Sequence, residues 1–236
     1  MRTSIVLLVL SAVVAGQGFG ELAKATSSLR LALERGQGKQ AVDALRAIPG
    51  QYPFADEKAQ RQAVAAVGKA VRSSDQSVRR AALAALSVLH ARGSSKYLAP
   101  WLDPPSRFKG PVPPEYIEAI LAAGAIADNA TLDRLRKLSR HADLTIAMTA
   151  MIALGGYHRL PVARRKELAF ELVDRLTRLD ATVVSNKKKN RKARERNVGL
   201  AAAAVKALRQ LTGQNLKTAV GWRNWKGLAT TLRDPF

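Results

Sequence analysis

The side chains of this sequence that are best suited to a binding function are cations, and they occur in two dense groups. Their chemistry would be the attraction of a polyanion, because guanidinium groups bind phosphate and carboxylate through paired hydrogen bonds and ammonium groups add point charges. The first group lies within Asn186–Arg196, which has the sequence NKKKNRKARER, and the second lies within residues 134–140. The candidate polyanion-binding residues are therefore Lys187, Lys188, Lys189, Arg191, Lys192, Arg194, Arg196, Arg134, Arg136, Lys137 and Arg140.

The whole chain is strongly cationic, with 39 Lys and Arg residues, 18 Asp and Glu residues and a formal charge of +21. Such an excess raises the local concentration of any polyanion. Further basic residues open and close the next predicted helix, at Arg164–Lys166 and at Arg175 and Arg178. Two interpretations stay open. These cations form a continuous basic groove, or they are compositional and lie on ordinary solvated faces.

Residues suited to catalysis or metal binding are sparse. The three histidines, His90, His141 and His158, are far apart and form no HExxH-type motif. The chain has no cysteine, which excludes disulfides, thiolate nucleophiles and the usual structural zinc sites. Glycine-rich phosphate loops and nucleophile elbows are also absent from the sequence. We predict a protein that is not an enzyme, with no catalytic, cofactor-binding or metal-binding residues and no cofactor.

Residues 1–18 have the features of a signal peptide. Arg2 supplies a short positive start, Ile5–Ala15 is apolar or small throughout, and Gly16-Gln17-Gly18 suits a signal peptidase. The apolar stretch is too short to cross a bilayer, which needs about 20 residues. We predict a periplasmic or secreted protein after signal-peptide cleavage, with no membrane span in the mature chain. The alternative is the buried first helix of a cytosolic repeat protein.

The elements that must position the cations are predicted to be helices. Tyr116–Ala127 and Ile146–Leu154 are apolar on nearly all sides, which places them in the middle of a helical stack. No segment alternates with a period of two, so we expect no strand. The motif Ala-x-x-Ala recurs at spacings typical of helical repeats, starting at Ala41, Ala63, Ala82, Ala119, Ala150 and Ala204. Two predicted core stripes are Val78, Ala82, Ala85, Leu86 and Leu89, and Ala201, Ala204, Val205, Leu208 and Leu211.

Three segments interrupt the predicted helices. Asp103–Pro114 contains five prolines and is predicted to be a loop. Gly155-Gly156 is predicted to end a helix and to leave Tyr157–Arg159 as an exposed turn. Asn186–Arg196 is predicted to be a mobile, exposed insertion, because its cations repel one another. The predicted helix N-caps are Asp56, Asp75, Asn129 and Asp143.

The segment DQSVRRAALAAL, Asp75–Leu86, resembles the first helix of a HEAT repeat, which typically has Asp, Val-Arg and then Ala-x-x-Ala-Leu. The segment AILAAGAIADNATLDRL resembles the helix–turn–helix of the next unit, with Asp128 at the turn. The unit that starts at Asp143 departs from the pattern, since LTIA replaces Val-Arg. The resemblance covers about residues 56–215. It implies an all-α fold, a right-handed α-solenoid of HEAT-like hairpins over residues 19–215, with the basic insertion at 186–196.

The end of the chain resembles the tail of exported bacterial HEAT-repeat proteins, through LTGQN at Leu211–Asn215 followed by Trp222 and Trp225. In that family the tail implies no enzymatic activity. Trp222, Trp225, Ala229 and Leu232 fall on one helical face, so residues 216–236 are predicted to form a capping helix with the two tryptophans as its anchors. The alternative is a pair of rings that stack on a ligand such as a sugar.

These observations predict a non-enzymatic scaffold or binding protein that acts outside the cytoplasm and presents a basic surface to its partner. The expected partner is another protein or an anionic envelope polymer, and nucleic acid is the secondary candidate. The alternative function is a HEAT-like DNA-binding protein or DNA alkylation-repair glycosylase, which requires that residues 1–18 are not a signal peptide. A HEAT-type lyase subunit is a third hypothesis, supported by the fold alone.

Overall fold

The computed structural model describes residues 20–91, 93–185 and 190–236, and every regular element in these ranges is helical. The prediction of an all-helical fold is confirmed. The predicted signal peptide, residues 1–18, lies outside the described residues. The chain divides into two compact units, one ending at Leu98 and one spanning Ala99–Phe236. Each unit is described by itself.

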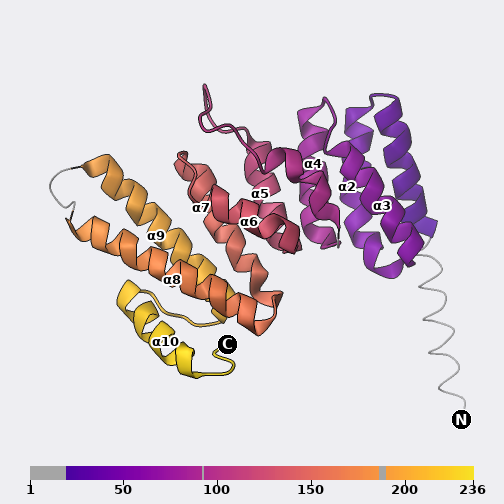
Figure 1. The fold of residues 1–236 in the computed structure, drawn as a ribbon. Helices are drawn as coiled ribbons and strands as arrows, with labels where there is room; N and C mark the ends of the chain where they lie inside the picture. Colours follow the sequence, from indigo (N-terminus) through magenta and orange to yellow (C-terminus); the bar gives the residue numbers. More distant parts are fainter. Residues whose placement is uncertain (1–19, 92, 186–189) are drawn as a thin grey trace, which may run out of the picture. The chain divides into compact units, whose positions relative to one another are not determined.

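The first unit is built around α4 (Gln76–Leu89), which packs against both α2 (Gly38–Gln51) and α3 (Glu57–Ala70) (Figure 1). A helix over residues 20–34 precedes α2. Short 3-10 turns follow α2 at Tyr52–Phe54 and α4 at Ser94–Tyr97. The predicted core stripe of α4 is confirmed, since all five of its members are buried: Val78, Ala82, Ala85, Leu86 and Leu89.

The second unit places α7 between α5 and α9, and α8 against both α9 and α10 (Figure 1). In addition, α6 packs against α7. Its elements are η3 (Ala99–Trp101), α5 (Pro114–Ile126), α6 (Asn129–Leu138), α7 (Leu144–Leu154), η4 (Gly155–Arg159), α8 (Val162–Ser185), α9 (Arg191–Thr212) and α10 (Ala219–Thr231).

The central position of α7 explains why it is apolar on nearly all sides. Its neighbours approach closely because glycines replace side chains at the contacts. A Cβ atom on Gly124 of α5 would lie 2.5 Å from the Ala153 carbonyl oxygen, and one on Gly156 would lie 2.0 Å from the Gly124 carbonyl oxygen. Gly155 makes a similar contact with α9, where a Cβ atom would lie 3.0 Å from the Cα of Ala207. These glycines are therefore packing residues.

The turn predicted at Tyr157–Arg159 differs from the structure at its first residue. Tyr157 is completely buried. Its hydroxyl donates to the Asp128 carbonyl at 3.0 Å and lies 2.7 Å from the Thr131 hydroxyl. The prediction of exposure was wrong because the chain does not leave the core after Gly155-Gly156, but continues through η4.

Aspartates cap four of the helices, α3, α4, α6 and α7. Asp56 accepts a hydrogen bond from Ala59 N, at 2.6 Å, and Asp75 and Asp143 cap α4 and α7. The predicted cap at Asn129 was wrong by one residue: Asp128 accepts from Ala130 N at 3.1 Å, and Asn129 is already the first residue of α6.

The proline-rich segment 103–113 contains no regular element, and its residues Asp103, Pro105 and Phe108 each contact the rest of the unit. The rings of Trp101 and Phe108 both pack edge-on to Tyr116, with centroids 5.3 Å apart in each pair. His141 Nε2 lies 3.0 Å from the Pro105 carbonyl oxygen, while its Nδ1 accepts from Asp143 N. The acceptor role of Nδ1 places the ring proton on Nε2.

The C-terminal helix α10 packs against α8, and Trp222 is completely buried. Trp225 lies edge-on to Trp222 and to Phe170 of α8, with centroids 5.6 and 6.1 Å away. The residues after α10 return to α8, where the Arg165 guanidinium stacks on Phe236 at 3.9 Å. Leu232, predicted to share the buried face, is 51% exposed because α10 ends at Thr231.

Candidate anion-binding site

The basic segment at 186–196 is partly helical in the structure. Lys187, Lys188 and Lys189 lie outside the described residues. Asn190 caps α9 through Ala193 N at 3.0 Å, so residues 191–196 form its first turns and not the expected loop. Arg191 pairs with Glu195 at 2.7 Å, whereas Lys192 and Arg194 are exposed.

Arg196, at the end of this segment, points to the chain that follows α6. Its Nη1 donates to the Ala142 carbonyl at 2.6 Å and its Nη2 donates to the His141 carbonyl at 2.7 Å. Both carbonyls belong to the connection between α6 and α7, so Arg196 ties the start of α9 to that connection. Arg196 therefore has a structural role that the sequence did not indicate.

Two of the candidate cations on α6 are occupied by acidic partners. Arg134 donates to Asp103 at 2.8 Å and to the Ala99 carbonyl at 3.0 Å. Arg136 is 21% exposed and lies 3.4 Å from Glu167 and 3.0 Å from Glu171, both on α8. The Arg136 pairs link α6 to α8, and the Arg134 pair links α6 to the segment that follows η3. Lys137 is exposed and forms no ion pair with the described residues.

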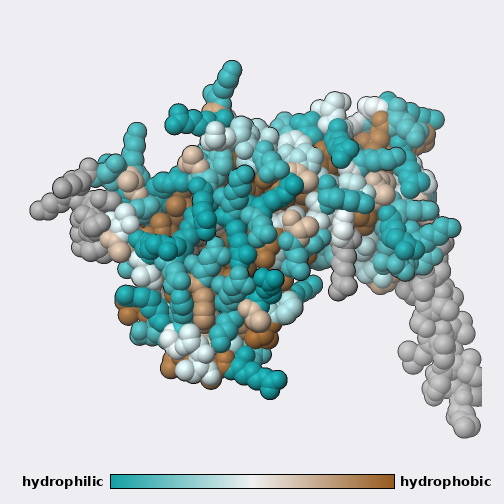
Figure 2. Space-filling model, viewed as in Figure 1, coloured by the Kyte–Doolittle hydropathy of each residue, from teal (hydrophilic) through white to brown (hydrophobic). Residues whose placement is uncertain are grey.

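A smaller cluster remains where the end of α6 meets α8. Arg140, Arg175 and Arg178 line a hollow of about 310 Å³ together with Glu171, Leu179 and Thr182. Arg140 lies 3.4 Å from Glu171 and keeps 70% of its side chain exposed. Arg178 is exposed and forms no ion pair within the described part of the chain. The surface over α6 and α8 is mostly hydrophilic in Figure 2.

Arg175 is the most confined member of this cluster. Its Nη1 donates to the Ser139 hydroxyl at 2.5 Å, and its Nη2 donates to the Ser139 carbonyl. Burial lowers the pKa of the Arg175 guanidinium, and the nearby charges of Arg140, Arg178 and Arg196 act in the same direction. Glu171 opposes them. The Arg175 guanidinium therefore lies near three other arginines and one carboxylate, and an anion bound there would offset the repulsion that Arg175 experiences.

The site differs from the sequence prediction in its members. Arg140 and Arg196 were candidate residues, and Arg175 and Arg178 were named among the cations of a possible basic groove, whereas Glu171 was not noted. The spacing of Arg175 and Arg178, three residues apart on one helix, was a usable signal that they share a face. Nothing in the sequence indicated that Ser139 lies beside them.

The basic residues at the start of α8 serve another purpose. Lys166 donates to the Leu232 carbonyl at 3.0 Å. Arg165 lies 3.8 Å from Asp234 and also stacks on the Phe236 ring. Arg164 pairs with Glu167 at 3.3 Å. Arg165 and Lys166 therefore hold the C-terminal residues and do not extend the anion site.

In the described parts of the chain, no three metal-ligating side chains gather into a cluster. No helix there is both long and apolar enough to cross a bilayer. The sequence matches no protein-family model and no curated protein.

Proposed function

We propose that this chain is a non-enzymatic helical-repeat protein that acts outside the cytoplasm and binds a polyanionic partner through the arginine cluster of α6 and α8. The observation that carries the proposal is the convergence of Arg140, Arg175 and Arg178 on one hollow that contains a single carboxylate, Glu171. A polymer with repeated phosphate, sulfate or carboxylate groups would satisfy several of these cations at once.

The fold supports this proposal through its arrangement of helices. In the second unit, α5, α7 and α9 form one row, while α8 packs against both α9 and α10. This arrangement is compatible with the proposed HEAT-like α-solenoid, in which α10 would be the capping helix over the last exposed face. A stack of this kind offers an extended surface for a partner and contains no inherent chemistry.

Location outside the cytoplasm rests on the predicted signal peptide. N-terminal sequencing of the protein purified from its native host tests it. A chain that starts near Gly16 or Phe19 supports export and favours an envelope polymer or an extracellular protein as the partner. A chain that keeps its first residues overturns export and makes nucleic acid the leading polyanion.

The test of the anion site is the salt dependence of polyanion binding. Heparin, polyphosphate and duplex DNA serve as probes for wild type and for a double variant, Arg140→Gln with Arg178→Gln. Each ionic contact contributes about 0.7–0.9 to the log–log slope of affinity against salt. We expect the double variant to bind more weakly and to flatten the slope by roughly 1.5, because it removes two contacts. The ranking of the three probes identifies the class of polyanion.

The matched control is Arg30→Gln with Arg35→Gln, which removes two exposed arginines from the first unit. It makes the same change in net charge and should leave the slope nearly unchanged. Equal slopes for both double variants would show that polyanion binding depends only on the net charge of the chain and not on the position of its cations. The proposal would be overturned if the wild type bound none of the three probes at physiological ionic strength.

The lysines of the basic segment are tested separately by replacing Lys187, Lys188 and Lys189 with Gln. Substitution is preferable to deletion of 186–196, because deletion would remove the first turns of α9 and the contacts of Arg196 with the connection between α6 and α7. A flattened slope in this variant would include the segment in the binding surface. An unchanged slope would confine the surface to α6 and α8.

A further inference from the structure

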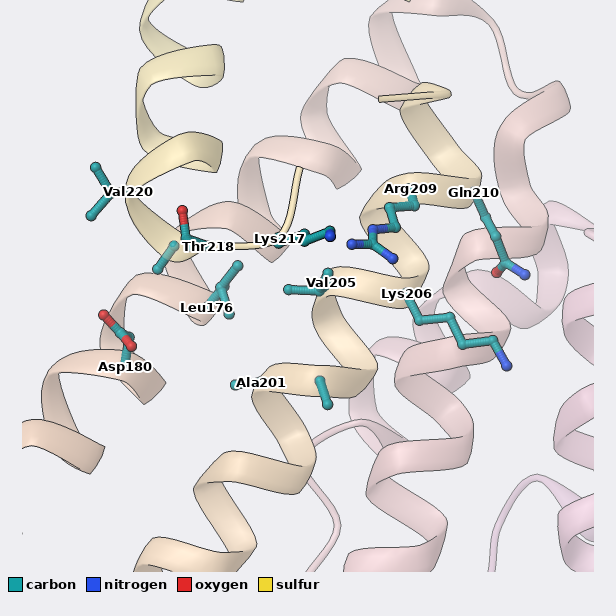
Figure 3. A pocket seen from close by; sticks show the side chains of 12 residues that line it. Leu176, Asp180, Ala201, Val205, Lys206, Arg209, Gln210, Lys217, Thr218 and Val220 are labelled. Carbon is teal, nitrogen blue, oxygen red and sulfur yellow. The ribbon is translucent and has the colours of Figure 1, made fainter. Parts of the chain in front are cut away.

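A groove on the other side of α8 combines an apolar floor with cations. It has a volume of about 880 Å³ and is formed by α8, α9, the connection after α9 and the start of α10. Leu176, Ala201 and Val205 face its interior, and Val220 closes it on the α10 side (Figure 3). Ala201 and Val205 were predicted to be core residues, yet both are only partly buried. The groove leaves their apolar surface partly open to water.

The apolar surface of this groove continues along α9. Val198 is 50% exposed, Val220 is 53% exposed, and Ala202 is also exposed. Val198, Ala201, Ala202 and Val205 follow the spacing i, i+3, i+4, i+7, so they lie on one face of α9. This face is distinct from the buried stripe of the same helix, which includes Leu200, Ala204 and Leu208. The helix therefore has two apolar faces, and one of them is without a cover in the described residues.

The charges around the groove are arranged unevenly. Arg209 and Lys217 lie close together beyond Val205, whereas Asp180 lies beyond Leu176 on the opposite side (Figure 3). Arg209 Nε donates to the Leu216 carbonyl at 3.1 Å, which fixes the base of its guanidinium group beside the groove. Lys217 is exposed. The groove thus presents an apolar strip with Arg209 and Lys217 at one end, and a third cation, Lys206, lies on its edge.

We propose that this groove binds an amphipathic helical segment of a partner protein whose apolar side chains are followed by acidic residues. The distance from Ala201 to Arg209 along α9 is about 12 Å, which matches two turns of a docked helix. Helices bind such grooves through apolar anchors three and four positions apart, and charge complementarity fixes their direction. The cations at one end select carboxylates at the corresponding end of the ligand.

An acyl chain fits the groove less well than a helix. The edges include exposed polar side chains along its length, among them Lys206 and Thr218, so the groove opens to solvent instead of enclosing its ligand. The site also differs from the arginine cluster in its residues and in its apolar floor. The inference therefore does not rest on the proposed polyanion binding.

Fluorescence anisotropy with two synthetic helices tests this assignment. Both carry leucines three and four positions apart, and one ends in glutamates while the other ends in lysines. We expect the acidic helix to bind, and the basic helix to bind about tenfold more weakly or not at all. Val220→Asp should lower the affinity for the acidic helix by about tenfold or more, because a carboxylate would be buried beneath the leucines of that helix. Lys217→Glu should do the same through charge repulsion.

The controls repeat these substitutions at matched exposed positions in the first unit. Val88→Asp and Lys24→Glu should leave the affinity for the acidic helix unchanged, since Val88 is 58% exposed and Lys24 is also exposed. The variant with Arg140→Gln and Arg178→Gln should also bind the acidic helix normally, which separates this test from that of the anion site.

Three outcomes would overturn the proposal. The first is no saturable binding of the acidic helix by wild type. The second is equal binding of the two helices, or equal effects of the groove and control substitutions. The third is binding to phosphatidylglycerol vesicles that Val220→Asp abolishes while neither helix binds, which would assign the groove to a lipid.

Discussion

At the scale of single residues, Tyr157 shows how one polar group can connect two helices within the core. Its hydroxyl bonds to the Asp128 carbonyl at the start of α6, although Tyr157 itself follows α7. Burial raises the pKa of Tyr157 to about 12. The neutral hydroxyl is therefore the form that the folded state favours, and its ionisation is linked to unfolding.

This linkage predicts a specific alkaline instability. Because the folded pKa lies above the ordinary value of about 10, the contribution of Tyr157 is fully present below pH ~10 and is lost as the pH rises through about 12. Tyr157→Phe should lower stability at neutral pH by about 0.5–1.5 kcal/mol and should reduce the loss at alkaline pH. Urea unfolding of both proteins across this pH range measures the difference. Parallel pH profiles for wild type and variant would contradict the linkage.

At the scale of elements, the contact between α5 and the α7–η4 segment depends on the absence of side chains. A Cβ on Gly124 would meet the backbone of Ala153, which cannot move aside as a flexible side chain can. Gly156 lies against the Gly124 carbonyl in the same way. The close approach lets α7 bury its apolar surface against α5 on one side and against α9 on the other.

Gly124→Ala should therefore destabilise the second unit by about 1–3 kcal/mol, despite the better helix propensity of alanine. Gly227→Ala is the matched control, because Gly227 lies inside α10 and a Cβ there would have no atom within 4 Å. That substitution should stabilise by roughly 0.5–1 kcal/mol, since alanine restricts the unfolded chain. Chemical denaturation provides both values. A neutral or stabilising effect of Gly124→Ala would show that the helices separate easily at this contact.

The same scale shows how far the sequence predicts this fold. The stripe of α4 was predicted fully, because its apolar residues share one face. The stripe of α9 was predicted in part: Ala204, Leu208 and Leu211 are buried, but Ala201 and Val205 line the groove. A periodic pattern identifies an apolar face but not the neighbour that covers it.

The anion site was less predictable than the helices. Charge density identified Arg136 as a candidate. One of its acidic partners, Asp133, lies three positions earlier on the same helix, but the other two lie 31 and 35 positions later in the chain, on α8. Whether a surface cation is occupied or free depends on packing between helices, which local sequence does not encode. Arg175 was not among the candidate residues, although its guanidinium is held beside Ser139 within the arginine cluster. The sequence near Arg175 does not show this contact with Ser139.

At the scale of the whole molecule, the C-terminal helix α10 covers part of α8. Trp222 of α10 is completely buried, and Lys226 of the same helix pairs with Asp174 of α8 at 2.5 Å. Loss of this helix would uncover apolar surface of α8, which invites aggregation. The proposed cap is therefore a determinant of stability for the second unit.

Trp222→Ala should cost about 3–5 kcal/mol and lower the melting temperature by on the order of 10 °C. Leu228→Ala, in the same helix, should have little effect because Leu228 is 68% exposed. Thermal unfolding monitored by circular dichroism compares the two. An unchanged melting curve for Trp222→Ala, together with lost ligand binding, would instead favour a ring-stacking role for the tryptophans.

The attachment of α10 has a further consequence for dynamics. Within the described chain α10 packs mainly on α8, whereas α7 is covered by α5, α6 and α9. Sub-global opening should therefore release α10 first, and its amide protons should exchange with solvent sooner than those of α7. Val220 belongs both to α10 and to the wall of the groove. A ligand that occupies the groove would hold α10 closed and slow this exchange, so that binding and local unfolding are coupled through a single helix.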